Sequence, residues 1–203
     1  MRICATVAGK PVLVREIDER EAMVRAGNLA SALPREGTSE GRQLRRWLTQ
    51  LVVAERVVAV EAAALGIGPV GAVGEDELLP DTAVRLEIGS VAAAVLATPL
   101  ARAVFTEVTR AVVISDDDIA AYHTRNPLRF AVKREVRQQG WQTNPVAPEF
   151  GDVRDEIAGH LLAAARRRAF RLWLDARCAE LVELAPGYEH PGDPRQPDNT
   201  HRH

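Results

Sequence analysis

The sequence predicts a mainly α-helical protein with a small β element, and three observations support this. Two long stretches, residues 40–65 and 152–180, carry apolar side chains at helical spacing with charged side chains between them. Short apolar alternations near both ends, at residues 3–14 and 179–184, are typical of strands. The 203 residues, 46% of them apolar and 27% charged, suffice for the buried core of a globular domain.

The first part of the chain is expected to be a short β element followed by two helices. Residues 3–7 and 11–14 predict either a short hairpin or a strand entering a turn. A helix then begins at Arg15, with acidic residues near the positive end of its dipole. The stretch 40–65 is the strongest helix, and Gly66 and Gly68 are expected to end it because glycine readily takes the left-handed C-cap conformation.

The middle of the chain predicts three more helices. Residues 82–98 and 99–110 are nearly uncharged in their central turns, so they are expected to be buried against the long helix. Ser115 is the predicted N-cap of the next helix, with Asp118 at the reciprocal capping-box position.

Two further strands are expected toward the C-terminus. Residues 133–141 alternate like a half-exposed strand. Residues 179–184 alternate like a final strand, and we expect it to pair with residues 3–7, bringing the ends of the chain together.

Composition disfavours several functional classes. The net charge of -2 and the 4% aromatic content argue against nucleic-acid binding. Cys4 and Cys178 have no CxxC partner, and two free thiols are expected rather than a disulfide between them. No signal peptide is recognised, and the low-charge run 89–101 is too short to span a bilayer. We therefore expect a cytoplasmic protein without membrane partners.

The last fourteen residues are rich in metal-ligand types. They hold three of the five histidines, three prolines and no large apolar residue. Imidazoles with carboxylates suit nickel, copper or zinc, and His201 and His203 fall on the same side of an extended chain. The candidate metal ligands are His190, His201, His203 and Asp198.

Catalytic chemistry has weaker support in the sequence. Tyr188, Glu189 and His190 form an acid/base trio, but GxSxG and HExxH motifs are absent. His160 lies four residues after Glu156, a spacing that favours an ordinary pair on a helix surface.

Three segments resemble the SurA/PrsA-type chaperones. Residues 7–18 (Val-Ala-Gly-Lys-Pro-Val-Leu-Val-Arg-Glu-Ile-Asp) are similar to the family's opening. Residues 47–66 are similar to its "L-x-x-L-I-x-x-x-L-l-x-x-e-A-x-x-x-G" helix. Residues 113–130, Val-Ile-Ser-Asp-Asp-Asp-Ile-Ala-Ala-Tyr-His-Thr-Arg-Asn-Pro-Leu-Arg-Phe, match "v-s-d-e-e-i-x-x-y-y-x-x-n-p-x-x-f" most specifically.

The resemblance implies a SurA N-terminal-domain-like helical bundle over residues 1–185, followed by a Pro/His-rich tail, 186–203. Residues 131–150 stand where the family carries a parvulin peptidyl-prolyl isomerase domain, and no parvulin signature appears there. The chain is thus expected to bind a client polypeptide or partner enzyme without catalysing prolyl isomerisation, and a homodimer is left open. The candidate client groove lies between the middle helices and comprises Val91, Val95, Leu96, Leu100, Val104 and Phe105.

Overall fold

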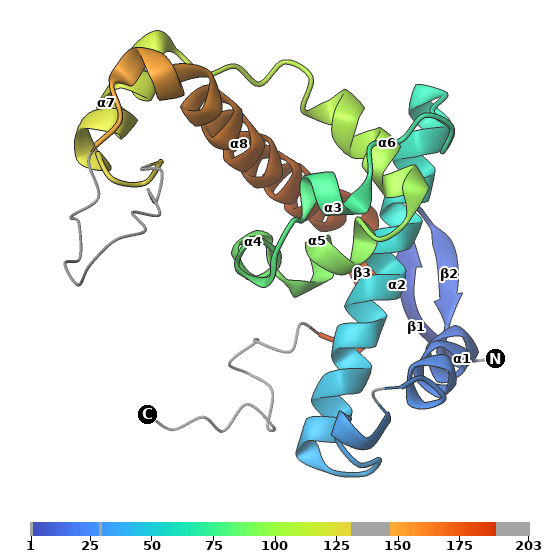
Figure 1. Cartoon of the computed structure of the whole chain (residues 1–203). Helices are drawn as coiled ribbons and strands as arrows, with labels where there is room; N and C mark the ends of the chain where they lie inside the picture. Colours follow the sequence, from blue (N-terminus) through green and yellow to red (C-terminus); the bar gives the residue numbers. More distant parts are fainter. Residues whose placement is uncertain (1, 29, 131–146, 190–203) are drawn as a thin grey trace, which may run out of the picture. The chain divides into compact units, whose positions relative to one another are not determined.

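The computed structural model describes residues 2–28, 30–130 and 147–189, and over these it confirms a mainly helical fold with a small antiparallel sheet (Figure 1). In chain order the described elements are β1 (Ile3–Val7), β2 (Lys10–Leu13), α1 (Val14–Arg25), a 3-10 turn (Ala30–Ala32), α2 (Ser39–Leu65), α3 (Glu75–Leu78), α4 (Thr82–Ile88), α5 (Ser90–Val95), α6 (Pro99–Val108), α7 (Asp116–Arg125), α8 (Phe150–Leu181) and β3 (Val182–Leu184).

The chain divides into two compact units, each with its own apolar core. Unit 1 comprises Met1–Val108 and Phe170–His203, and unit 2 comprises Thr109–Ala169. Helix α8 contributes its first part to unit 2 and its last part to unit 1. The sheet and helices α1 to α6 all belong to unit 1.

The sheet has the order β2-β1-β3, so the predicted pairing of the two chain ends is confirmed. β1 and β2 form a hairpin in which Val7 is opposite Lys10. The two turn residues, Ala8 and Gly9, have φ values of 49° and 74°, as expected for a tight hairpin turn. On the other side of β1, Val7 is opposite Val182.

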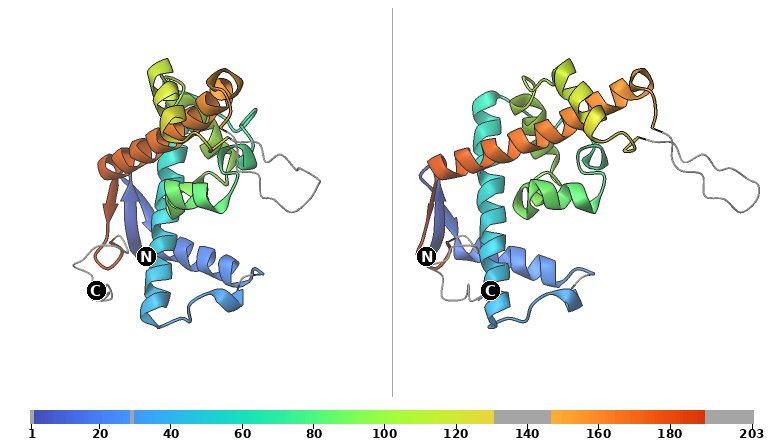
Figure 2. Two further views of the ribbon diagram at one scale, coloured as in Figure 1. Left: turned by 60° about the vertical axis from the view of Figure 1, so that its left-hand side comes forward. Right: turned by 90° about the vertical axis from the view of Figure 1, so that its left-hand side faces the viewer.

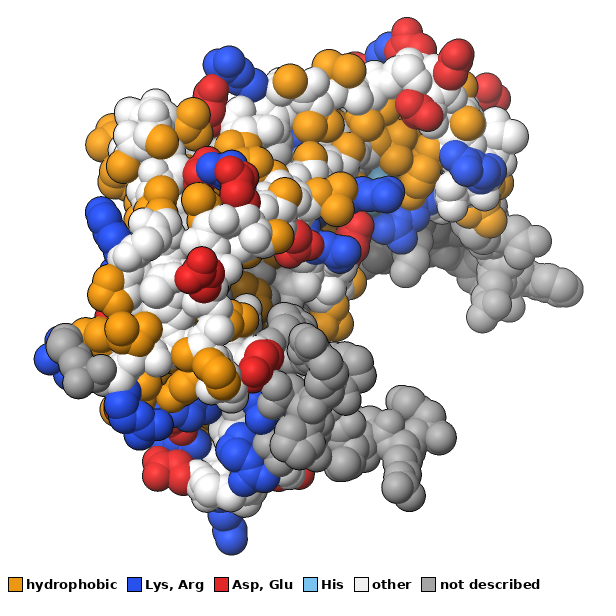
Figure 3. Space-filling view, turned by 180° about the vertical axis from the view of Figure 1, so that it is seen from behind, with side chains coloured by type: hydrophobic (Ala, Val, Ile, Leu, Met, Phe, Trp, Pro, Cys, Tyr) orange, Lys and Arg blue, Asp and Glu red, His pale blue; other side chains and the backbone are white. Residues whose placement is uncertain are grey.

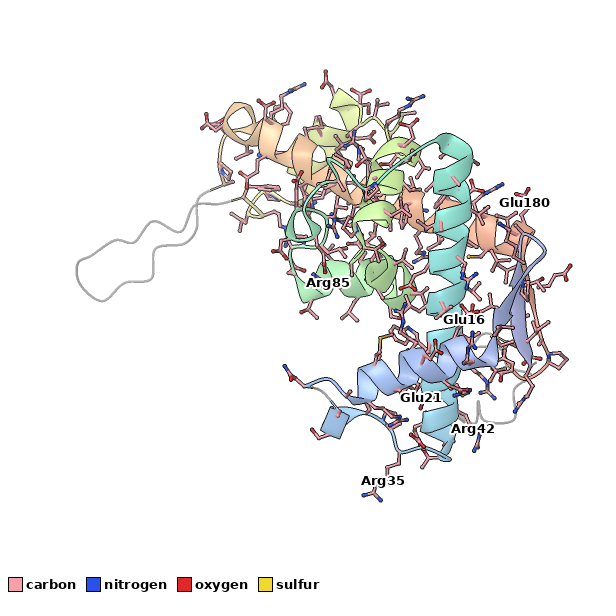
Figure 4. The ribbon with its side chains drawn as sticks, turned by 90° about the vertical axis from the view of Figure 1, so that its right-hand side faces the viewer. Glu16, Glu21, Arg35, Arg42, Arg85 and Glu180 are labelled. Atoms are coloured by element: carbon pink, nitrogen blue, oxygen red, sulfur yellow. The ribbon has the colours of Figure 1, made fainter. Side chains whose placement is uncertain are left out.

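Helix α1, which carries Glu16 and Glu21, crosses α2 (Figure 4), and ion pairs as well as apolar packing fix it there. Arg20 of α1 donates two hydrogen bonds to Glu55 of α2, at 3.0 and 2.5 Å. Arg45 of α2 contacts Glu21 at 3.0 Å and also pairs with Asp18. These ion pairs explain why charged side chains occur where α1 packs against α2.

Helix α2 confirms the predicted 40–65 helix and supplies one wall of the unit 1 core. The Thr38 side chain caps its start by accepting from the Gly41 N–H at 3.0 Å. Gly66 ends it with φ 67°, the left-handed cap that the sequence predicts. Its apolar face packs on the sheet, α5 and α6, and Phe105 of α6 packs against Phe170 of α8 at 5.4 Å between ring centroids.

The prediction of one helix over residues 82–98 is wrong, because the chain breaks at Gly89. This residue has φ 94° and ψ 145°, a conformation outside the helical region, and separates α4 from α5. Asp81 caps α4 by accepting from the Val84 N–H at 2.8 Å. The break lets two short helices pack on the core in different directions where one straight helix was expected.

Unit 2 is built from α7 and the first part of α8. Ser115 is the N-cap that the sequence predicts, and its Oγ accepts from the Asp118 N–H at 3.1 Å. The core of this unit centres on Ile119, Val153 and Ile157. The strand predicted at residues 133–141 lies outside the described residues.

Candidate functional site

The predicted metal ligands, His190, His201, His203 and Asp198, lie outside the described residues. The chain is described up to Glu189, whose carboxylate accepts a hydrogen bond from the Gly187 N–H at 2.8 Å. Across residues 2–28, 30–130 and 147–189, no group of three or more His, Cys, Asp or Glu side chains is arranged to hold a metal ion.

The predicted client groove falls mainly inside the unit 1 core. Four of its six residues have buried side chains, with exposed fractions of 0% to 3%: Val95, Leu96, Val104 and Phe105. Val91 and Leu100 are half-buried and pack against that core from its margin. Of the six predicted groove residues, only Val91 and Leu100 are therefore accessible to a partner in the folded chain.

Other apolar side chains, on α2, α4 and α5, reach the surface of unit 1. Trp47 of α2 is half-buried, and its indole N–H donates to the exposed hydroxyl of Ser90 at 3.0 Å. Leu44 lies one helical turn before Trp47, and Leu86 of α4 is 75% exposed. We call these four residues, Leu44, Trp47, Leu86 and Val91, the Trp47 surface.

Local structure explains why the Trp47 surface stays accessible. The turn at Gly89 ends α4 and starts α5, which brings Ser90 to the indole N–H of Trp47. A tryptophan that satisfies its N–H at a surface hydroxyl keeps part of its ring at the protein boundary. Figure 3 shows, on the face seen from behind, hydrophobic side chains reaching the surface in several places between charged ones.

Near this surface, the chain after β3 returns to α2. The Gln50 side chain, one turn beyond Trp47, donates to the carbonyl of Tyr188 at 3.4 Å. Tyr188 also packs against the core of unit 1. The Tyr188 and Glu189 members of the predicted acid/base trio are therefore engaged in local structural contacts.

The histidines of unit 2 are held by aromatic neighbours. The Tyr122 hydroxyl and His160 Nε2 are 3.3 Å apart, and their rings are 5.6 Å apart. His123 Nε2 lies 3.1 Å from the Pro148 carbonyl, and its ring packs on Phe150. The sequence favoured a pair between His160 and Glu156, and Tyr122 is the contact that the structure shows.

Several ionisable groups in unit 1 have pKa values that are shifted by burial or by hydrogen bonds. Burial raises the pKa of Cys178 to about 11, and burial also raises the pKa of Cys4. Both are free thiols, as expected. Burial alone would lower the pKa of Arg45, but its hydrogen bonds to Asp18 and Glu21 outweigh that effect and raise it.

The start of the chain is similar to a known protein family. A protein family described as a family of unknown function, DUF7158, matches residues 3–40, which comprise β1, β2, α1 and the segment leading to α2. No curated protein matches the chain, and no solved structure matches it. Among the described helices, none combines the length and the apolar character needed to cross a membrane.

Proposed function

We propose that this chain is a non-catalytic, SurA-like chaperone or maturation accessory that binds a client polypeptide. The observation that carries the proposal is the Trp47 surface. An apolar area that remains accessible on a folded protein is what a holder of partly folded chains requires. The proposed contact is with apolar side chains of the client.

The order of elements also supports the proposal. The segments that resemble the SurA/PrsA-type chaperones form β1 through α1, then α2, then α7. β1 pairs with β3 and also packs against α2, so the sheet anchors the long helix. Such anchoring holds Trp47 in place without help from a client.

Suppression of aggregation of a chemically unfolded test protein measures client binding. Leu86→Glu introduces a charge into the Trp47 surface at a side chain that is already exposed, so folding is preserved. We expect the variant to need about five- to thirtyfold more protein for the same suppression, since partial burial of one leucine side chain contributes about 1–2 kcal/mol, less than the roughly 1.5–3 kcal/mol of complete burial.

Val70→Glu is the matched control. Val70 is 95% exposed and lies outside the Trp47 surface, so the same change of charge should leave suppression unaltered. Equal activity of Leu86→Glu and the wild-type chain would contradict the proposal, as would equal losses in both variants. A prolyl-isomerase assay on the wild-type chain is expected to show no acceleration.

The spacing of His201 and His203 favours a second candidate, a metal-binding accessory that uses the C-terminal tail with nickel, copper or zinc. Calorimetric titration of each metal into the full chain and into a chain lacking residues 190–203 tests this. Equal metal affinity of the two chains would contradict metal binding by the tail.

A further inference from the structure

The sheet has two outer strands, β2 and β3, beside the central strand β1 (Figure 2). The backbone hydrogen-bonding groups on the two outer edges differ in availability. In an antiparallel ladder, successive residues direct their N–H and C=O alternately toward one neighbour and toward the other. The Ala8 N–H donates to the Leu181 carbonyl at 2.8 Å, and the Ala185 N–H donates to the Cys4 carbonyl at 2.9 Å. These two bonds fix which residues of β3 face β1.

On β3, Glu183 directs its backbone N–H and C=O toward β1, because it lies an even number of positions from Leu181 and Ala185. Val182 and Leu184 therefore direct backbone groups toward the outer edge. Within the described part of the chain, no acceptor takes the N–H of Leu184. This edge offers both a donor and acceptors to an added strand.

The outer edge of β2 lacks free backbone donors, which prevents an added strand from pairing with it. Pro11 directs its backbone outward and has no N–H to donate. The Leu13 N–H already donates to the Glu16 carboxylate at 3.0 Å. Proline and occupied donors are devices by which proteins protect a sheet edge from pairing, and Leu184 of β3 has neither.

The side chains of β3 define what can pair with it. Val182 and Leu184 are half-buried on the core side of the sheet, whereas Glu183 is exposed on the other side, opposite Thr6. The Thr6 hydroxyl donates to one carboxylate oxygen of Glu183 at 3.5 Å. An added antiparallel strand would place apolar residues beside Val182 and Leu184 and one residue directly opposite Glu183.

The negative charge of Glu183 decides which kind of strand can pair with this edge. A second copy that pairs through the same edge in the register centred on Glu183 would place Glu183 opposite Glu183 in the closest type of cross-strand pair, where like charges repel. A lysine or arginine at that position is attracted instead. We propose that the outer edge of β3 binds an extended client segment of apolar–basic–apolar sequence as an added antiparallel strand. This inference rests on the proposed function for the identity of its partner.

Peptide binding to the full chain, followed through backbone amide shifts in a 15N-labelled sample, tests the proposal. The probes are acetylated, amidated Thr-Val-Lys-Val-Thr, the same peptide with glutamate at its centre, and the lysine peptide with both valine amides methylated. We expect the lysine peptide to shift the Leu184 amide and to bind about two- to fivefold more tightly than the glutamate peptide. Methylation should weaken binding about tenfold, because it removes the donors that pair with β3.

Glu183→Lys should reverse the preference between the lysine and glutamate peptides. The matched control is Lys10→Glu, an exposed position on the closed β2 edge, which should leave the preference unchanged. The proposal is overturned if no peptide shifts Leu184, if methylation has no effect, or if Glu183→Lys keeps the wild-type preference. Aggregation suppression that persists in those cases would show that client binding stands and only the edge assignment fails.

Discussion

Replacing Gly89 by alanine should destabilise the protein, although the added methyl group has room. A Cβ at this position meets no heavy atom within 4 Å, so steric contact contributes nothing. The backbone has φ 94° and ψ 145°, a region that is populated almost only by glycine and costs other residues about 1–3 kcal/mol. Alanine also restricts the unfolded chain, which offsets about 0.4–1 kcal/mol. The expected net loss is about 1–2 kcal/mol.

Gly159→Ala is the matched control. Gly159 lies inside α8, has no positive φ, and an added Cβ there also meets nothing within 4 Å. Alanine should stabilise the helix there by about 0.5–1 kcal/mol. Urea unfolding followed by far-ultraviolet circular dichroism measures both variants. If Gly89→Ala gained stability and helical content as Gly159→Ala does, residues 82–98 would be a continuous helix and the reasoning would be refuted.

Three further outcomes are expected for stability. Phe170→Ala should lower the free energy of unfolding by about 3–5 kcal/mol, because a fully buried ring is removed from between two others; a loss below about 1 kcal/mol in urea unfolding would contradict this packing. Glu21→Gln should cost about 1–3 kcal/mol, since two arginines share this nearly buried carboxylate, whereas Glu19→Gln, in an exposed pair, should change stability by less than about 0.5 kcal/mol. The pKa of the Cys178 thiol is raised from 9.0 to about 11 in the folded chain, so between pH 9 and 11 the unfolded chain loses this proton while the folded chain keeps it. The free energy of unfolding should therefore fall as the pH rises from 9 to 11. Cys178→Ala should flatten that part of the pH–stability curve, and an unchanged slope would show that the thiol is not responsible.

Hydrophobic periodicity was sufficient to predict the hairpin, the two long helices and the pairing of the chain ends. Helix α2 has apolar residues at helical spacing over many turns and a glycine at its end, so both its type and its end are readable. The strand β3 was predictable because residues 179–184 alternate and a turn follows at Pro186 and Gly187.

The break at Gly89 and the exposure of apolar residues were not predictable in the same way. A single glycine in a run of alanine and valine is compatible with a helix, and only packing against α2 decides its backbone conformation. Val91 and Val95 look alike in the sequence, yet the first is at the margin of the core and the second is inside it. The one available signal for the Trp47 surface was the indole N–H, which needs a partner and therefore favours a position near polar groups.

The pairing of β1 with β3 also constrains the order in which the molecule can assemble during synthesis. β1 is the central strand, yet one of its two neighbours, β3, is translated only after helices α1 to α8. Until residues 182–184 leave the ribosome, β1 has only β2 beside it, and closing so long a loop is entropically costly. Nascent chains halted before that point should therefore expose an aggregation-prone strand and become substrates for cellular quality control.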